Sequence, residues 1–297
     1  MKLVFASDFH LRNDQPVSRT DDFLQVQNDT LKFIAQICKQ NNADLIVAGD
    51  VFNKAKQENM QFLINDLYDI FKKINIYFIA GNHDLLFHSI ENFEKCNIGL
   101  LGKFDNWYWE NNDNVDDFNN YFNFFNYDVE IKNTLENEKL TFCIMHRYCE
   151  IDNLPEYISD GITAKLLLEK YDYNYFIIGD NHKAFEYEKD GRFVFNTGCI
   201  TRQSINEKDY KPSVILFDTE KKEYEKIYLP DNQQNVWKEE QITQQIKREN
   251  RIDGFINLIG ADKSISLDYI NNLKKHCQEN KIEKEITNEI EIMLEEK

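Results

Sequence analysis

The sequence predicts a mixed α/β (α+β) fold followed by a charged helical extension. Short apolar runs alternate with helical stretches over residues 2–81, as is typical of βαβ units with buried strands. A second group of apolar runs, over residues 140–230, has fewer helical stretches between its members. Strand-like runs then stop, and residues 233–297 continue as charged helical sequence.

The first apolar runs predict strands at residues 2–7, 44–49 and 75–81, with helices at residues 22–40 and 58–74 between them. Five further strands are predicted, at residues 140–146, 173–180, 192–198, 213–218 and 224–230. Together these elements favour two packed sheets or one large mixed sheet. Residues 104–128 are rich in Asn, Asp and aromatic side chains, and we interpret them as a loop-rich insertion.

We place a domain boundary near residue 232, with a main domain over residues 1–232 and a C-terminal segment over residues 233–297. In the last part of this segment, apolar residues recur largely at helical spacing, which indicates an amphipathic helix or a pair of helices. Two interpretations stay open. The helix packs back on the main domain, or it docks a partner protein.

Length and composition indicate a globular protein. With 297 residues, of which 42% are hydrophobic, the chain can bury a full core. No stretch approaches the roughly 18 to 20 apolar residues that a membrane span needs, and the N-terminus lacks the pattern of a secretion signal. The six cysteines form no CxxC pair, which argues for a reducing compartment and for cysteines that act as small buried hydrophobes. We expect a cytoplasmic protein with no membrane partner.

The formal net charge of −17 argues against a protein coated in basic surface, which a nonspecific nucleic-acid binder usually carries. It leaves room for an enzyme that acts on nucleic acid. Bound divalent cations would neutralise part of an acidic cluster, and a partner subunit could supply the basic surface.

Polar side chains follow five of the predicted strands, at the point where each strand ends. In open α/β sheets the carboxyl ends of the strands line the crevice where ligands bind, so these side chains can converge. Four of the six histidines belong to this group. The residues are Asp8, His10, Asp50, Asn82, His83, Asp84, His146, Asp180 and His182.

Carboxylates, imidazoles and an amide oxygen form a mixed ligand set that suits Mn, Fe, Zn or similar divalent ions. Two such ions lie roughly 3.5 to 4 Å apart when one carboxylate bridges them, and the pair activates water for in-line displacement at phosphorus. Asp50 is the candidate bridge. Taken alone, Asp50 could instead cap the next helix, and His146 could be an ordinary core histidine, but the joint pattern favours a metal site.

The ordered motifs D-x-H, GD, GNHD, H and GDxH resemble those of the calcineurin-like metallophosphoesterase family, whose usual final motif is GHxH. The resemblance covers residues 1 to about 230. It implies a double β-sandwich flanked by helices, with a dinuclear metal site at the strand ends.

The resemblance also implies a role for each motif residue. One ion is expected on Asp8, His10, Asp50 and His182, and the other on Asp50, Asn82, His146 and Asp180. His83 is expected to act on the phosphate or the leaving group. Asp84 is expected to orient His83 through a hydrogen bond, and Gly81 to permit the tight turn that brings the group together.

Within the family, two stretches resemble the SbcD-like nuclease subunit of DNA repair and recombination complexes, particularly its short phage and bacterial forms. They are "SDFHLRNDQPVSRTDDF" and "FNTGCITRQS", the second being similar to the "PGS-x-x-R" stretch of those nucleases. The likeness implies DNA as substrate, an SbcC-like coiled-coil ATPase as partner and a possible homodimer. It places the protein in the cytoplasm of a bacterial cell or a phage-infected host.

Two departures from the family pattern bear on chemistry. Asp180 replaces a histidine, which adds negative charge to the site. The added charge favours a harder ion such as Mn, with Mg, Fe or Zn as further options. Asn53 stands where nuclease relatives often carry a histidine near the leaving group. Together with Arg202 of the "TRQS" stretch, Asn53 is expected to contact the substrate.

The function predicted first is therefore that of a metal-dependent DNA exonuclease or endonuclease subunit. A stand-alone phosphoesterase for a small nucleotide or a phosphoprotein is the alternative, and the acidic charge supports it. A third reading, a degenerate member that serves as a scaffold, is disfavoured because every ligand position holds a competent residue.

Overall fold

The computed structural model describes residues 1–57, 60–110, 114–117, 120–127, 129–133, 139–155, 158, 160–230, 237–238, 240 and 243. The chain divides into two compact units, Met1–Lys238 and Glu239–Lys297. The helical segment predicted over residues 233–297 lies outside the described residues apart from positions 237, 238, 240 and 243.

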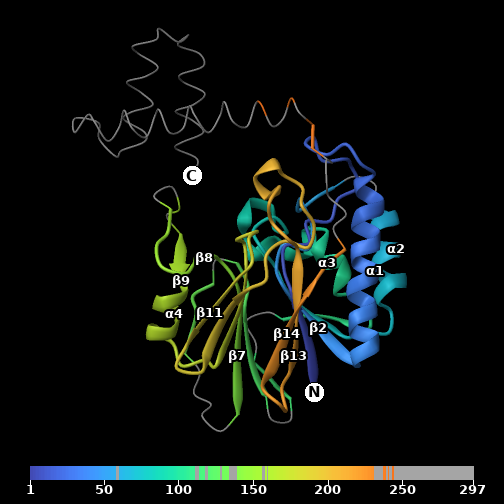
Figure 1. The fold of residues 1–297 in the computed structure, drawn as a ribbon. Coiled ribbons are helices and arrows are strands. Elements are labelled where there is room, and N and C mark those ends of the chain that lie inside the picture. Colours follow the sequence, from blue (N-terminus) through green and yellow to red (C-terminus); the bar gives the residue numbers. More distant parts are fainter. Residues whose placement is uncertain are drawn as a thin grey trace, which may run out of the picture. The chain divides into compact units, whose positions relative to one another are not determined.

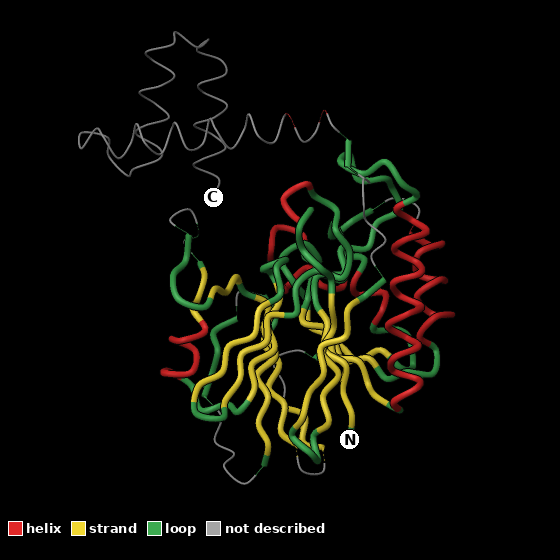
Figure 2. Tube along the Cα trace, viewed as in Figure 1, coloured by secondary structure: helices red, strands yellow, loops and turns green. Residues whose placement is uncertain are grey.

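Within the described part of Met1–Lys238, two six-stranded sheets stack face to face, with helices on their outer sides (Figures 1 and 2). The first sheet has the order β14-β13-β1-β2-β3-β4. Strands β1 to β4 run parallel, and β13 and β14 add an antiparallel edge. The strands are β1 (Lys2–Ala6), β2 (Ala43–Ala48), β3 (Ile76–Ile79), β4 (Trp107–Trp109), β13 (Ser213–Asp218) and β14 (Glu223–Tyr228).

The second sheet has the order β11-β12-β10-β7-β6-β5. Its four inner strands run parallel, and an antiparallel strand closes each edge. The strands are β5 (Asn114–Asp117), β6 (Asn120–Phe125), β7 (Leu140–His146), β10 (Tyr175–Gly179), β11 (Phe185–Lys189) and β12 (Arg192–Asn196). A short ribbon of β8 (Tyr148–Glu150) and β9 (Gly161–Thr163) forms a separate two-stranded sheet, and its Cys149 and Ile162 pack in one core cluster with residues of the second sheet.

Helices cover the outer faces of the two sheets. Helices α1 (Phe23–Asn41) and α2 (Met60–Phe71) follow β1 and β2 and pack on the first sheet, and α4 (Ala164–Lys170) packs on the second (Figure 1). The shorter helices are η1 (Leu86–His88), η2 (Ile90–Lys95), α3 (Ile98–Leu101) and η3 (Ile205–Glu207).

Alternate residues of each inner strand enter different cores. In β1, Leu3 and Phe5 are buried between the sheets, whereas Val4 and Ala6 are buried against the helices. A strand that is buried on both faces must be apolar throughout, which is why these runs show no polar alternation. The mixed α/β prediction, with two packed sheets and flanking helices, is confirmed.

Residues 104–128 are not the loop-rich insertion that we predicted, because they contain β4, β5 and β6. Strand β6 pairs in parallel with β7 inside the second sheet. Its Phe122 and Phe124 are buried between the sheets, and Phe125 is buried on the opposite face. Burial of these aromatic rings outweighs the turn preference of the surrounding Asn and Asp residues.

The sequence analysis also does not anticipate β11, which forms a hairpin with β12. The two turn residues, Asp190 and Gly191, have positive φ angles of 55° and 76°. An Asp-Gly pair between two strands is a strong hairpin signal. Strand β11 carries many polar residues because it lies at the edge of the sheet.

Five cysteines, Cys38, Cys96, Cys143, Cys149 and Cys199, are buried and free of disulfides, as predicted for small hydrophobes. Cys277 lies outside the described residues. Among the helices that the structure describes, none combines the length and the apolar character needed to cross a membrane.

Candidate metal centre

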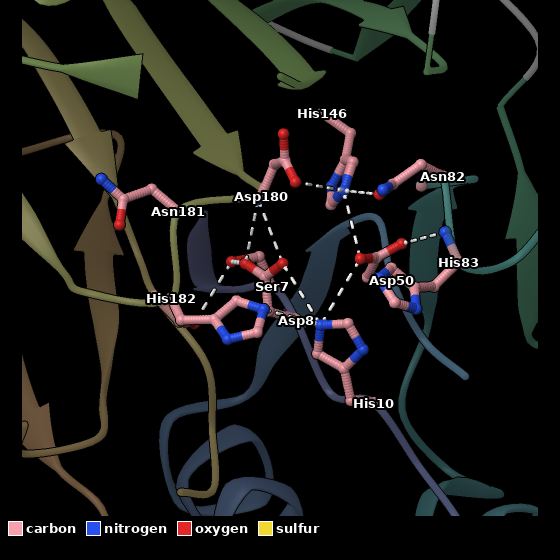
Figure 3. A network of polar contacts seen from close by, with 12 residues as sticks. Ser7, Asp8, His10, Asp50, Asn82, His83, His146, Asp180, Asn181 and His182 are labelled. Carbon is pink, nitrogen blue, oxygen red and sulfur yellow. Dashed lines mark hydrogen bonds and ion pairs between the residues drawn. The ribbon is translucent and has the colours of Figure 1, made fainter. Parts of the chain in front are cut away.

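The carboxyl ends of β1, β2, β3, β7 and β10 meet at one place, and the polar residues that follow these strands converge there (Figure 3). The first sheet contributes the side chains after β1, β2 and β3. The second sheet contributes those at the ends of β7 and β10. The seven predicted metal ligands are thus brought together, as Figure 3 shows for Asp8, His10, Asp50, Asn82, His146, Asp180 and His182.

Four of these residues have left-handed backbone conformations, with φ of 51° for Asp8, 43° for His10, 51° for Asp50 and 93° for Asp180. Side chains other than glycine adopt such angles at a cost of order 1 kcal/mol each, so the surrounding structure must hold them there. Concentrated backbone strain of this kind is typical of functional sites.

Two glycines make room for the ligands. A Cβ atom on Gly49 would lie 2.4 Å from Nδ1 of His146, and one on Gly81 would lie 2.1 Å from Oδ1 of Asp50. Neither position tolerates a larger residue without moving a candidate ligand. The GD and GNHD motifs therefore need their glycines for close packing, and at Gly49 also for a φ of 86°.

The first group of donors consists of Asp8, His10 and His182. Nε2 of His10 lies 3.0 Å from Nε2 of His182, 3.9 Å from Oδ1 of Asp8 and 3.4 Å from Oδ2 of Asp50. The backbone N–H of Asp180 donates to both carboxylate oxygens of Asp8, at 3.0 and 3.2 Å.

The second group surrounds His146. Its Nε2 lies 3.1 Å from Oδ1 of Asn82, 3.4 Å from Oδ2 of Asp50 and 4.0 Å from Oδ1 of Asp180. Oδ2 of Asp50 is thus 3.4 Å from a histidine of each group. Asp50 lies between the two groups, where a bridging carboxylate would lie.

The hydrogen bonds around the two groups leave lone pairs that face one another. Nδ1 of His146 lies 2.7 Å from the carbonyl oxygen of Ala48, which can only accept, so the proton belongs on Nδ1 and the lone pair on Nε2. Nδ1 of His182 is placed in the same way by Glu207, at 2.7 Å. Converging lone pairs of imidazole nitrogens and carboxylates repel unless a proton or a cation lies between them, so this donor set fits divalent cations.

Burial and mutual charge shift the pKa values in the absence of a cation. Burial raises the pKa of Asp8 to about 6, and it lowers the pKa of His10 to about 3. For Asp50, burial acts to raise the pKa, but the charges of His146 and His10 outweigh it and lower the pKa. Burial acts to lower the pKa of His182, yet the hydrogen bond to Glu207 raises it to about 9.

His83 differs from the ligands because its side chain is exposed. Its backbone N–H donates to Oδ1 of Asp50 at 2.9 Å, which ties it to the centre of the donor set. Its Nδ1 lies 3.1 Å from the carbonyl oxygen of Asn53, so Nδ1 carries the proton there and Nε2 is left for other partners. The ring lies edge-on to that of His10, with the ring centroids 4.8 Å apart.

Asp84 does not orient the imidazole of His83, contrary to our expectation. Its carboxylate is fully buried and accepts backbone N–H groups of Val51 at 3.1 Å, Phe52 at 2.8 Å and Gly81 at 3.0 Å. Among the described residues, the hydrogen bonds of this carboxylate go to the backbone and not to the imidazole of His83, which lines the pocket. Asp84 therefore joins the turn after β2 to the turn after β3, and the carbonyl group of Asn53 positions His83.

Arg202 likewise does not contact the substrate pocket. It is 6% exposed, its guanidinium donates to the carbonyl oxygen of Lys208, and its Cζ lies 5.7 Å from the centroid of the Trp237 ring. These contacts bury the charge away from the donor set. Asn53, the other expected substrate contact, does line the pocket next to His83.

The pocket at the donor set has a volume of about 230 Å³. Besides His10, His83 and His182, its lining includes side chains that the sequence analysis does not single out. These are Arg12, Cys199, Thr201, Gln203, Ser204 and Glu207.

Glu207 is the most informative of the residues that the sequence analysis misses. It lies in η3, where its Oε2 accepts the backbone N–H groups of Gln203 and Ser204 while Oε1 faces His182. The stretch from Ser204 to Glu207 forms a capping box, a recognisable helix-start signal. That signal locates the turn, but not the histidine 25 residues away that the glutamate holds.

Known proteins similar to this chain belong to one family model and a set of solved structures. A family model described as calcineurin-like phosphoesterase matches residues 1–217. Similar solved structures include an archaeal phosphodiesterase, which is 19% identical with a TM-score of 0.43 and covers 77% of this chain and 100% of its own. TT1561 of Thermus thermophilus is 9% identical with a TM-score of 0.47, and the match covers 76% of this chain and 98% of that one. Vps29 of Entamoeba histolytica is 13% identical with a TM-score of 0.37, over 77% and 99%. No curated protein matches the chain.

Proposed function

Because the chain belongs to the calcineurin-like phosphoesterase family, we propose that this metal-dependent phosphoesterase is a phosphodiesterase that cuts DNA. It would serve as the SbcD-like nuclease subunit of a DNA repair or recombination complex. The observation that carries the proposal is the position of Asp50, whose carboxylate is 3.4 Å from a histidine of each donor group and accepts the backbone N–H of the exposed His83.

Two divalent cations are proposed for the centre. Asp8, His10, Asp50 and His182 would hold one, and Asp50, Asn82, His146 and Asp180 the other. When bound, such ions supply Lewis acidity that activates water and stabilises charge on the phosphoryl oxygens. The carboxylate of Asp180 makes the second group oxygen-rich, which favours Mn, with Mg, Fe and Zn as weaker candidates.

Hydrolysis adds the oxygen of a water molecule to phosphorus and breaks the bond from phosphorus to one ester oxygen. The departing oxygen needs a proton, and the water must lose one. His83 is suited to the first of these steps: its imidazole is exposed, and Asn53 holds the Nδ1–H, so that in its doubly protonated form His83 would give the Nε2 proton to the departing oxygen, while the proton lost by the water would pass to solvent. The remaining histidines of the centre are directed at the metal positions.

Two observations favour DNA as the substrate. The pocket volume of about 230 Å³ is below the roughly 300–1,000 Å³ of sites that enclose small ligands, which suits a substrate such as DNA that is not enclosed as a whole. The stretches "SDFHLRND" and "CITRQS" resemble those of SbcD-like nucleases. On this proposal, the basic surface that DNA requires, and that a net charge of −17 does not provide, would come from an SbcC-like ATPase partner.

The acidic charge favours a second candidate, a stand-alone phosphoesterase for a small nucleotide or a phosphoprotein. One experiment separates the two. The purified protein is given linear DNA or a small chromogenic diester with Mn, Mg or EDTA, with and without its ATPase. Mn-dependent release of nucleotides from linear DNA supports the nuclease. Hydrolysis of the small diester alone supports the second candidate, and no hydrolysis of either substrate rejects a phosphodiesterase of either kind.

A further inference from the structure

We propose that Arg12 binds a phosphate group next to the scissile one, so that the site prefers a chain of linked phosphodiesters to an isolated diester. The inference rests on the proposed function and specifies its substrate class. Among the described residues that line the pocket at the donor set, Arg12 is the single lysine or arginine.

The backbone of Arg12 is fixed from both sides by one buried side chain. The backbone N–H of Arg12 donates to Oε1 of Gln27 at 3.0 Å, and Nε2 of Gln27 donates to the carbonyl oxygen of Arg12 at 3.0 Å. Gln27 is 3% exposed and lies in α1. These two hydrogen bonds fix the backbone of Arg12, two residues after the candidate ligand His10. The fold therefore sets the position of Arg12.

The guanidinium is held at the pocket by two further contacts. Nη1 donates to Oε1 of Gln203 at 3.3 Å, and Nε2 of the same Gln203 donates to the carbonyl oxygen of His10 at 2.9 Å. On its other side the guanidinium forms a two-pronged pair with Asp14, at 2.8 and 2.9 Å. Of the five N–H donors, these contacts use three, and no described residue is recorded with the other two.

The charge balance around Arg12 favours an anion. A guanidinium presents a planar fork that matches phosphate oxygens, and such contacts are stronger than neutral hydrogen bonds. The side chain of Asp14 is 59% exposed, so water screens its hold on Arg12, whose own side chain is 15% exposed. In a protein of net charge −17, one cation fixed beside the donor set gives a polyanion a defined direction of approach.

On the proposed function, the scissile phosphate would be held by the ions that the two donor groups bind and by His83. Among the hydrogen bonds of the described residues, the guanidinium of Arg12 is linked to the donor set through Gln203, which in turn donates to the backbone of His10. It therefore reaches a neighbouring group of the substrate. In a nucleic-acid strand, that neighbour is the next phosphate along the backbone.

The test measures binding and hydrolysis separately, on the full-length protein. Binding of fluorescein-labelled oligothymidylate is followed by fluorescence anisotropy in Ca²⁺, at several KCl concentrations. Hydrolysis in Mn²⁺ is followed with the oligothymidylate and with thymidine 5′-(p-nitrophenyl phosphate), which has one phosphate. The variants are R12A, R12K and, as a control for loss of one positive charge elsewhere, K189A, whose side chain is 46% exposed on β11.

We expect R12A to weaken oligothymidylate binding about tenfold. The slope of log affinity against log salt should become shallower by about 0.7, the value for one phosphate contact on a single strand. R12K should keep the slope and lose part of the affinity, and K189A should match wild type. In hydrolysis, R12A should raise KM for the oligomer and leave the one-phosphate substrate within about twofold.

An unchanged salt slope in R12A, equal losses on both substrates, or a wild-type protein that does not bind the oligomer would overturn the inference. Failure of the proposed function looks different. Wild-type protein would then hydrolyse neither substrate, while the Arg12-dependent binding of the oligomer would persist.

Discussion

Nδ1 of His182 lies 2.7 Å from Oε1 of Glu207, and this contact sets which nitrogen of the histidine faces the metal centre. Glu207 is itself fixed, because its second oxygen accepts the backbone N–H groups of Gln203 and Ser204 at 2.6 and 3.0 Å. A carboxylate behind a ligating histidine fixes the ring and makes its free nitrogen a better ligand.

Glu207→Ala should therefore lower metal affinity or activity roughly 10- to 100-fold. Glu207→Gln, which can still accept the Nδ1 proton, should lose less. Isothermal titration with Mn²⁺ measures both variants. Wild-type affinity in Glu207→Ala would show that the pair plays no part in metal binding.

Asp50→Asn should reduce turnover about a thousandfold and lower the amount of bound metal, because Asn carries no charge to share between two ions. The fold should survive, since the amide oxygen can still accept the backbone N–H of His83. Elemental analysis and a thermal melt accompany the rate. Full activity in this variant would reject the centre as described.

His83→Ala should lose about a hundredfold to ten-thousandfold in rate while metal content stays near wild type, because His83 is proposed to move a proton and not to hold metal. His88→Asn is the matched control. His88 is also exposed and has a φ of 53°, which Asn tolerates, and it lies outside the donor groups. Loss of metal together with rate in His83→Ala would mean that His83 is a ligand.

Metal affinity should rise with pH. The pKa of Asp8 is raised to about 6 by burial, so below pH 6 a proton occupies the carboxylate that the cation needs. The pKa of His182 is raised to about 9, where burial opposes the shift but the bond to Glu207 prevails, and its proton competes up to that pH. The apparent affinity for Mn²⁺ should therefore climb between pH 5 and pH 8, and binding should release protons. A flat profile in titrations over that range would contradict the assignment of these two ligands.

A chain that ends at Lys238 should keep hydrolysis of a small diester and its melting temperature, but lose association with the proposed SbcC-like ATPase. Trp237 stays in this chain, with its ring 5.5 Å from the Arg19 guanidinium and 5.7 Å from that of Arg202. A chain that ends at residue 230 lacks these contacts and should melt roughly 3–6 °C lower. An unstable chain ending at Lys238 would favour the alternative in which the C-terminal segment packs on the main domain. If that chain still bound the proposed ATPase normally, the C-terminal segment would not be the docking element.

The sequence is most informative where chain connectivity decides the structure. Parallel strands joined by helices must present their carboxyl ends at one edge, so the convergence of the residues after β1, β2 and β3 follows from the order of apolar runs. Burial on both faces made the same strands easy to find. The same reasoning, applied to the ends of the later apolar runs, also singled out His146 and His182, which the second sheet positions.

What escaped prediction depends on contacts between distant segments. The residues next to Asp84 in the sequence do not tell whether its carboxylate accepts backbone N–H groups or orients a histidine. In both cases the sequence shows an aspartate shortly after a strand. Arg202 was expected at the substrate, but Trp237 and Lys208 hold it elsewhere. In β6, the burial of Phe122 and Phe124 depends on a sheet that is not visible in the local composition.

The metal centre lies on the seam between the two sheets, since Asp8 and Asp50 come from one and His146 and Asp180 from the other. The bond from Nδ1 of His146 to the carbonyl oxygen of Ala48 already crosses that seam. A cation held there would act as a cross-link between two halves of the core. The rate of amide hydrogen exchange at the adjoining ends of β2 and β7 would then report on metal occupancy. A chelator would raise exchange at these strand ends under conditions in which both sheets stay folded.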